Sequence, residues 1–352
     1  METAAGLRRS SRSLTMPRSI LFLAGLFATA LAFAQQGAAP APHAIDIPKW
    51  FTESFLDFRE DVRDAAKENR RLLVYFGQDG CPYCKALMKV NFGEKDIVEK
   101  TRRHFVAIAI NLWGDREVTW VDGRKMTEKE LGRVLKVQYT PTLLFLDEKG
   151  QVALRLNGYV PPDRFRVALD YAAQKMEGSV SYAEYLAKRT GVAATDALGS
   201  QPFFHKGADL ARTLKAGKPL AVLFEQKGCK ECAELHREGF TRPDVRRLVD
   251  RFTVVQLDLA GSRALVTPDG TPTNERAWAA ELRITYAPTL VFFDSGGKEV
   301  FRAEGYLRPF HLASALEYVA EGAYRQEPSF QRHIQKRADA MRAAGKTVDL
   351  WK

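Results

Sequence analysis

The 352-residue chain has few cysteines, no long hydrophobic stretch and no run of five or more like charges. Four cysteines are too few for a small secreted scaffold that depends on many disulfides. An uncharged apolar run near the N-terminus covers only 14 residues, whereas a membrane-spanning helix needs about 20. The net charge of +10 is not gathered in basic runs, which argues against nucleic-acid binding.

The first 34 residues are typical of a secretory signal peptide. Four arginines, the last of them Arg18, precede the apolar run over 20–33. Ala32-Phe33-Ala34 fits the small-residue pattern of a cleavage site, so we expect the mature chain to begin at Gln35. This leader predicts an exported, periplasmic protein.

The rest of the chain is a repeat of one unit. Three short motifs occur twice, in the same order and 147 or 148 residues apart: Gly80-Cys81-Pro82-Tyr83-Cys84 and Gly228-Cys229-Lys230-Glu231-Cys232, Tyr139-Thr140-Pro141-Thr142 and Tyr286-Ala287-Pro288-Thr289, and Asn157-Gly158-Tyr159 and Glu304-Gly305-Tyr306. Two copies are too few for a solenoid, so we expect tandem domains of about 150 residues each.

Within each copy, apolar runs of strand length alternate with helical patterns, which predicts an α/β fold with a central mixed sheet flanked by helices. In the first copy we expect helices over 51–69, 85–90, 128–135 and 162–175, strands over 72–76, 105–112, 142–146 and 152–156, and a hairpin over 118–126. The predicted order is a signal peptide (1–34), a flexible tether (35–48), a first domain (49–177), a linker with a helix at 182–189 (178–204), a second domain (205–325) and a helical tail (326–352). The sequence does not indicate which domain the tail contacts.

All four cysteines lie in the two Cys-x-x-Cys pairs, and each pair is predicted to open a helix. The first sulfur of such a pair lies over the unpaired N–H groups of the first turn, which stabilise a thiolate. We therefore assign to Cys81 the attack on a substrate disulfide, and to Cys84 the resolution of the mixed disulfide. Pro82 suits the first turn because it has no N–H to lose.

For the second pair, Cys229 and Cys232, the sequence leaves two roles open. Lys230 favours a thiolate at Cys229 and Glu231 opposes it, so the two neighbouring charges leave the reduction potential undetermined. This dithiol would act as an internal relay, or the second domain would serve only to bind a substrate.

Pro141 and Pro288 each open an apolar strand, where a trans proline is disfavoured because it lacks an N–H for the sheet. We therefore expect both bonds to be cis. The backbone of Thr140 would then present hydrogen bonds to a substrate beside Cys81. Ala287 stands at the position of Thr140 in the second copy, which would change this contact.

Metal binding is the main alternative for the sulfurs. Zinc sites pair two Cys-x-x-Cys units about 15–20 residues apart, whereas 144 residues separate Cys84 from Cys229. His236 follows Cys232 by four positions and could complete a soft-metal site, although a packed histidine is the simpler interpretation. Paired thiolates also suit Cu(I), as in a metallochaperone, but the chain has no Met-rich or His-rich run. We predict no metal and no cofactor besides the cysteine pairs.

These motifs resemble the thioredoxin fold, twice, and within it the SoxW-type periplasmic thioredoxins. The segments that carry the resemblance are Gly80 to Lys85, Asn111 to Val118, Thr140-Pro141-Thr142-Leu143, Ala287-Pro288-Thr289 and Gly305 to Phe310. The resemblance implies thiol–disulfide exchange, a link to sulfur-oxidising (Sox) systems, and electrons from a membrane transporter of the DsbD or CcdA kind. One departure concerns the buried Asp that cytoplasmic thioredoxins carry six residues before the first cysteine, where this chain has Tyr75 and Leu223. The usual proton acceptor for the resolving thiol is therefore missing.

The sequence thus predicts a periplasmic protein-disulfide reductase. We expect its substrate, a protein disulfide, to contact six residues around the motifs: Pro82, Tyr83, Thr140, Pro141, Ala287 and Pro288. A disulfide oxidase or isomerase, a Cu(I) metallochaperone and a non-enzymatic binding module remain as alternatives.

Overall fold

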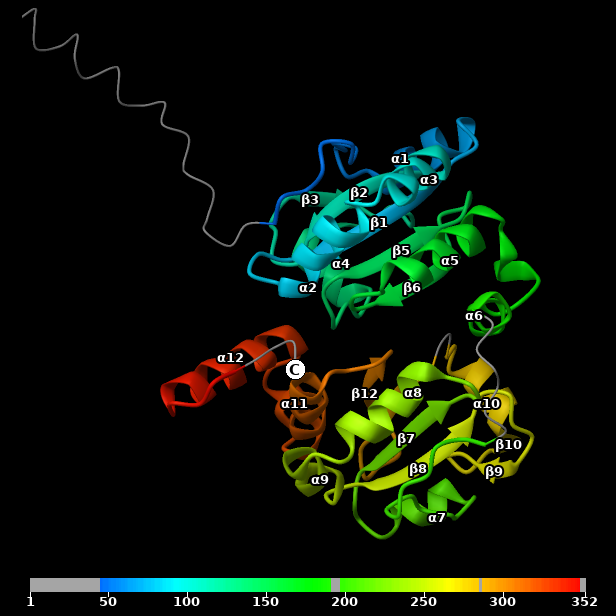
Figure 1. Ribbon diagram of the computed structural model, residues 1–352, viewed down its shortest axis with the longest axis vertical. Helices are drawn as coiled ribbons and strands as arrows, with labels where there is room; N and C mark the ends of the chain where they lie inside the picture. The colour runs from blue at the N-terminus through cyan, green and yellow to red at the C-terminus, as the bar shows by residue number, and fades with distance from the viewer. Residues whose placement is uncertain (1–44, 191–196, 285–286, 349–352) are drawn as a thin grey trace, which may run out of the picture. The chain divides into compact units, whose positions relative to one another are not determined.

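The computed structural model describes residues 45–190, 197–284 and 287–348 (Figure 1). The predicted signal peptide and most of the predicted tether lie outside these ranges, as does Tyr286 of the second Tyr-Ala-Pro-Thr motif. In the ranges described, no helix has the length and apolar character needed to cross a membrane.

The first repeat is built on a mixed sheet, as predicted, and its four strands have the order β2-β1-β5-β6. Its strands are β1 (Arg71–Gly77), β2 (Phe105–Asn111), β5 (Thr142–Leu146) and β6 (Val152–Asn157), with a hairpin of β3 (Glu117–Thr119) and β4 (Lys125–Thr127). Its helices are α1 (Phe58–Lys67), α2 (Pro82–Ala86), the π-helical turn η1 (Leu87–Asn91), α3 (Lys95–His104), α4 (Glu128–Val134), α5 (Pro162–Ala173), the 3-10 turn η2 (Met176–Gly178) and α6 (Tyr182–Thr190). β1 and β2 are parallel, and β5 is antiparallel to both of its neighbours.

The second repeat has the same topology, with its sheet in the order β12-β11-β7-β8. Its strands are β7 (Leu220–Glu225), β8 (Thr253–Asp258), β11 (Thr289–Phe293) and β12 (Glu299–Glu304), with a hairpin of β9 (Ala264–Val266) and β10 (Pro272–Asn274). Its helices are α7 (Leu210–Leu214), α8 (Lys230–Glu234), the π-helical turn η3 (Leu235–Gly239), α9 (Pro243–Val249), α10 (Glu275–Glu281), α11 (Pro309–Ala320) and the 3-10 turn η4 (Ala323–Arg325), and α12 (Phe330–Ala343) follows.

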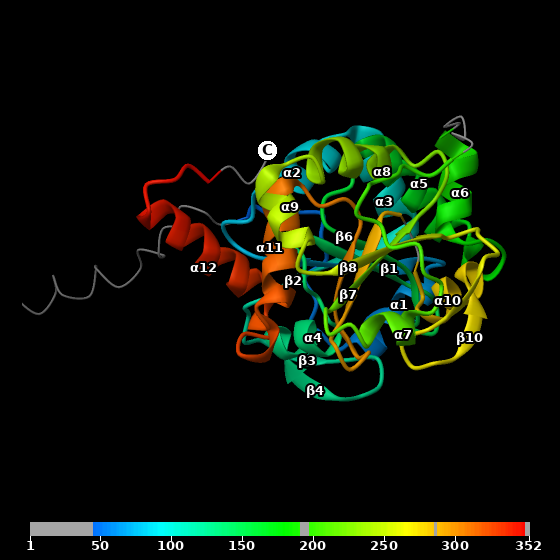
Figure 2. The same ribbon diagram turned by 90° about the horizontal axis from the view of Figure 1, so that it is seen from below.

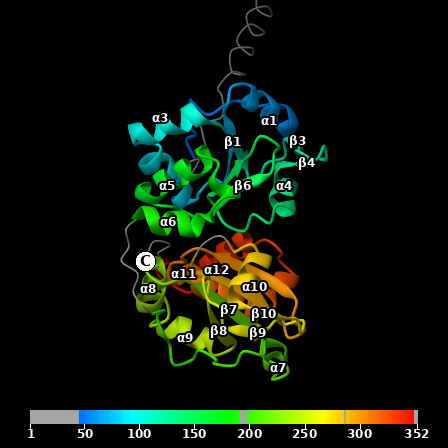
Figure 3. The ribbon, with the colours of Figure 1, turned by 90° about the vertical axis from the view of Figure 1, so that its right-hand side faces the viewer.

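Each sheet is covered by helices on both faces because alternate residues of its central strands enter two cores. In β1, Leu73 and Tyr75 pack with α2, η1 and α5, whereas Leu72 and Val74 pack with α1 and α4. Figure 3 shows α3 and α5 on one side of this sheet and α1 and α4 on the other. The motif helices α2 and α8 thus begin directly after a buried central strand, which holds each cysteine pair at one end of its sheet.

Three elements differ from the prediction. The first helix begins at Phe58 rather than 51, because Asp57 caps it through the N–H groups of Arg59 and Glu60 and Leu56 has a φ of 62°. The motif helix changes to a π-helical turn after Ala86. The third difference is α3, which was not predicted because most of its residues are charged or polar and only Ile97 and Thr101 are fully buried.

Two segments outside the predicted domains pack onto them. α6, in the predicted linker, places Tyr182 and Tyr185 in the core of the first repeat. α12, in the predicted tail, lies beside α11 (Figure 2) and places Phe330 and Ile334 in the core of the second.

Candidate active site

Cys81 and Cys84 lie where β1 passes into α2, and they form a disulfide. Cys81 is the N-cap residue of α2, and its Sγ accepts a hydrogen bond from the N–H of Cys84 at 3.0 Å. Pro82 occupies the first turn of this helix. Cys81 lines a cavity, whereas Cys84 is fully buried. Cys81 is therefore the sulfur that an incoming disulfide can reach.

The loop before β5 lies against this sulfur. Its Thr140–Pro141 bond is cis, as is Ala287–Pro288 in the second repeat, which confirms the predicted isomers. The carbonyl oxygen of Thr140 lies 3.5 Å from Cys81 Sγ. Thr142 Oγ1 donates to the carbonyl oxygen of Tyr139 at 2.8 Å and holds the loop in place. The backbone of Thr140 is thus placed to contact a chain bonded to Cys81.

The second pair repeats this geometry at the start of α8. Cys229 and Cys232 form a disulfide, and Cys229 Sγ accepts a hydrogen bond from the N–H of Cys232 at 3.0 Å. Lys230 occupies the position of Pro82, and Glu231 the position of Tyr83. The local geometry is the same in both pairs, so any difference in their chemistry must come from the surrounding side chains.

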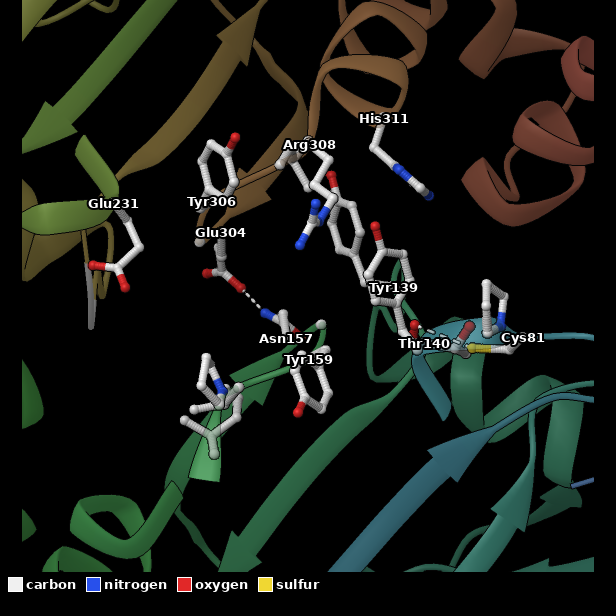
Figure 4. Close-up of a pocket in the computed structure, with 18 of the residues that line it drawn as sticks. Cys81, Tyr139, Thr140, Asn157, Tyr159, Glu231, Glu304, Tyr306, Arg308 and His311 are labelled. Carbon is white, nitrogen blue, oxygen red and sulfur yellow. Dashed lines mark hydrogen bonds between the residues drawn. The ribbon is translucent and has the colours of Figure 1, made fainter. Parts of the chain in front are cut away.

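A cavity of about 320 Å³ lies over Cys81, and both repeats contribute to its wall (Figure 4). Four of the six predicted substrate contacts line it, namely Pro82, Tyr83, Thr140 and Ala287, whereas Pro141 and Pro288 do not. Near the second pair, Glu231 and Glu234 of α8 reach this wall, whereas neither Cys229 nor Cys232 does. The structure therefore brings Cys81 and Glu231 to one cavity but does not open both sulfur pairs to it.

The contacts across the cavity join equivalent positions of the two repeats. Tyr83, the third residue of the first Cys-x-x-Cys, packs edge-on against the ring of His311 with centroids 5.5 Å apart. Glu231, its counterpart in the second motif, forms an ion pair with Arg164. Arg164 and His311 are themselves counterparts, each at the third position of α5 or α11. The repeats thus meet with approximate two-fold symmetry.

One pair lies on this symmetry axis. Asn157, at the end of β6, donates a hydrogen bond to Glu304, its counterpart at the end of β12 (Figure 4). The guanidinium group of Arg302 lies 3.6 Å from the other oxygen of Glu304. The sequence identified Asn157 and Glu304 only as landmarks of the repeat. Their contact could not be predicted, because an offset in sequence carries no information on how two domains meet.

The helix α12 contacts both repeats and contributes Gln331, Ile334 and Gln335 to the cavity wall. Phe330 is fully buried, and its ring lies 5.4 Å from that of Tyr139 in the first repeat and 4.8 Å from that of Phe301 in the second. Gln331 Nε2 donates to the carbonyl oxygen of Gln138 at 2.9 Å. The tail therefore contacts both domains, and on the first it contacts the residues just before Thr140.

His311 makes this interface sensitive to acid. Burial, together with the positive charges of nearby Arg308 and Arg337, lowers the pKa of His311 to about 4. The unfolded chain therefore binds more protons than the folded one between about pH 6.5 and 4. We expect the free energy of unfolding to fall as the pH falls through this range. The H311Q variant should lack the part of this decrease that comes from protonation of His311. Urea denaturation from pH 7.5 to 4 measures it.

The control for this prediction is H205Q, since His205 is exposed in the second repeat. It should leave the pH dependence of unfolding as in the parent chain. Equal pH dependence of H311Q and the parent would contradict the assignment to His311.

Among the residues described, no three His, Cys, Asp or Glu side chains are grouped as a metal ion would require. His236, considered above as a metal ligand, is buried and lies beside a glutamate. The Cu(I) metallochaperone stays an untested alternative.

A profile of the thioredoxin-like domain matches the chain twice, at residues 58–173 and 207–320. Two curated proteins named thiol:disulfide interchange protein DsbD are similar to part of the chain. The one from Pectobacterium atrosepticum is 31% identical over 113 residues, which are 31% of this chain and 18% of that protein. The one from Tatumella citrea is 30% identical over 121 residues, 33% of this chain and 19% of that protein. The similarity therefore spans less than a fifth of either relative.

Solved structures are similar to single repeats. A thioredoxin-fold protein from Helicobacter pylori is 25% identical with a TM-score of 0.30, covering 40% of this chain and 98% of that one. The oxidised C-terminal domain of DsbD from Neisseria meningitidis is 20% identical with a TM-score of 0.25, covering 32% of this chain and 88% of that one.

Proposed function

The chain belongs to the thioredoxin-like domain family, and on this basis we propose that it is a thiol–disulfide oxidoreductase that works as a periplasmic protein-disulfide reductase. The observation that carries the proposal is the position of Cys81. Its sulfur caps α2, lines the cavity and lies 3.5 Å from the backbone carbonyl of Thr140, while Cys84 is buried behind it.

In the proposed cycle the reduced Cys81 attacks as a thiolate, which the N–H of Cys84 and the helix N-terminus stabilise. Its Sγ forms a bond to one sulfur of the substrate, and the other substrate sulfur leaves as a thiolate and takes up a proton. Cys84 then loses its proton and attacks Cys81 Sγ, which releases the second substrate thiol. Two electrons pass from the cysteine pair to the substrate, and the Cys81–Cys84 disulfide is left.

We place Cys229 and Cys232 upstream of this pair, as a relay that re-reduces the Cys81–Cys84 disulfide. Support comes from the common cavity, to which the two motifs contribute Tyr83 and Glu231. Because the cavity wall includes neither Cys229 nor Cys232, the relay needs a change in the arrangement of the repeats during the cycle. A Cys229→Ser variant with unchanged turnover and unchanged electron uptake would contradict the relay.

The compartment and partners follow from the leader and the resemblance. The expected signal peptide at 1–34 places the mature chain in the periplasm, where a membrane transporter of the DsbD or CcdA kind would supply electrons. The link to sulfur-oxidising systems rests on the resemblance to SoxW-type proteins.

The redox state of both pairs in intact cells tests the proposal. Cells are quenched with acid, free thiols are labelled with a mass tag, and the parent is compared with C81S/C84S and C229S/C232S variants. Reduced Cys81 and Cys84 in an oxidising compartment require a supply of electrons and support the reductase. If Cys81 and Cys84 are oxidised, the chain is a disulfide oxidase or a reductase without a supply of electrons, and its reduction potential decides between the two.

A further inference from the structure

A buried carboxylate and imidazole lie together in the second repeat. Glu225, the last residue of β7, is fully buried, and its two carboxylate oxygens lie 3.0 and 3.1 Å from Nε2 of His236. Gln256 Nε2 donates to the carboxylate at 2.6 Å, and Gln201 Nε2 lies 3.2 Å from Nδ1 of His236. With the Gln201 amide donating to Nδ1, His236 carries its proton on Nε2 and donates it to Glu225. The pair then holds one negative charge and can take up one proton.

The fold itself does not require this pair. The first repeat has Gly77 and Met88 at the two equivalent positions, 148 residues earlier. There a Cβ on Gly77 would lie 1.9 Å from the hydroxyl oxygen of Tyr75, whose ring takes the space that Glu225 fills in the second repeat. Burying a carboxylate costs free energy that a packed aromatic ring avoids. A role in the chemistry of the second pair would explain why the charge is there.

Helix spacing places His236 on the same face as the resolving sulfur. His236 follows Cys232 by four residues on the continuous helix of α8 and η3, and residues at this spacing are neighbours on a helix. Glu225 ends the strand that leads into Cys229. Of the other charges on this helix, Arg237 and Glu238 form an ion pair with each other at the surface. Lys230 is exposed, and Glu231 is half-buried and pairs with Arg164.

We propose that Glu225 and His236 together accept the proton of Cys232 when it resolves a mixed disulfide, a role that rests on the proposed function of the second dithiol. In this step the S–H bond of Cys232 breaks and the pair takes the proton. The thiolate attacks Cys229 Sγ, a disulfide forms between the two cysteines, and the partner sulfur leaves with the electron pair of the broken S–S bond. His236, at the edge of the core, then returns the proton to solvent. The pair replaces the acid that is missing at Leu223.

The test isolates the second pair in the full-length C81S/C84S chain. Reduced Cys229 is reacted with 5,5′-dithiobis(2-nitrobenzoic acid), and the release of the second coloured thiolate reports closure of the Cys229–Cys232 disulfide. E225Q should slow closure at neutral pH by about 10²-fold, the contribution of a general base. The difference should vanish at alkaline pH, where Cys232 ionises without help. H236Q should show the same shift in pH profile.

The matched control is E238Q, which removes an exposed carboxylate from the same helix and should leave the profile unchanged. A folded E225Q with the parent pH profile would overturn the proposal, and if E225Q does not fold, the H236Q profile decides in the same way. Failure of the second pair to react in the parent C81S/C84S chain would instead contradict the relay, which separates the two proposals.

Discussion

The C84S variant should stop the catalytic cycle at the mixed disulfide. Cys81 remains in place to attack, because its helix cap and its exposure to the cavity do not depend on the buried sulfur of Cys84. The second step then has no thiol, so the substrate stays bonded to Cys81. Incubation with a disulfide-containing protein such as insulin, followed by non-reducing electrophoresis, should show a new covalent adduct that dithiothreitol releases.

In the companion variant C81S, the rate of disulfide reduction should fall to the uncatalysed rate. The first pair should form no adduct, because the attacking sulfur is gone. C229S/C232S is the control for the identity of the nucleophile, and it should still form the adduct when combined with C84S. An adduct in C81S/C84S as strong as in C84S would show that the second pair attacks the substrate, and the assigned roles would be wrong.

The F330A variant should lower the free energy of unfolding by about 3–5 kcal/mol, the usual loss when a buried phenylalanine is truncated to alanine. Phe330 is fully buried, and its ring contacts those of Tyr139, Phe301 and Tyr318. Because these rings come from both repeats, the cavity left behind also weakens the contact between α12 and the loop before Thr140. Urea denaturation measures the loss.

The matched control is F55A, since Phe55 is fully exposed. The same change of side chain should there cost less than about 0.5 kcal/mol, the range of ordinary surface substitutions. An equal loss in the two variants would mean that α12 does not pack as described. Limited proteolysis should in addition cut F330A near α12 sooner than F55A.

Much of the fold was predictable because it depends on local patterns. The continuous apolar run of β1 and the offset between the two Cys-x-x-Cys motifs predicted two similar mixed sheets, and the missing N–H of Pro141 predicted its cis bond. α3 was missed because a helix with few buried residues has weak periodicity. The first helix was placed seven residues early because the cap at Asp57 is a matter of side-chain geometry.

The sequence by itself determined the two sulfur pairs, their order along the chain and the strand-to-helix junctions that carry them, since spacing within one helical turn is local. Only the tertiary structure decided what surrounds them. It joined Arg164 to Glu231 and Tyr83 to His311 across a cavity, and it paired Glu225 with His236. These residues are distant in sequence or belong to different elements, and their contacts depend on how elements pack, which no local pattern specifies.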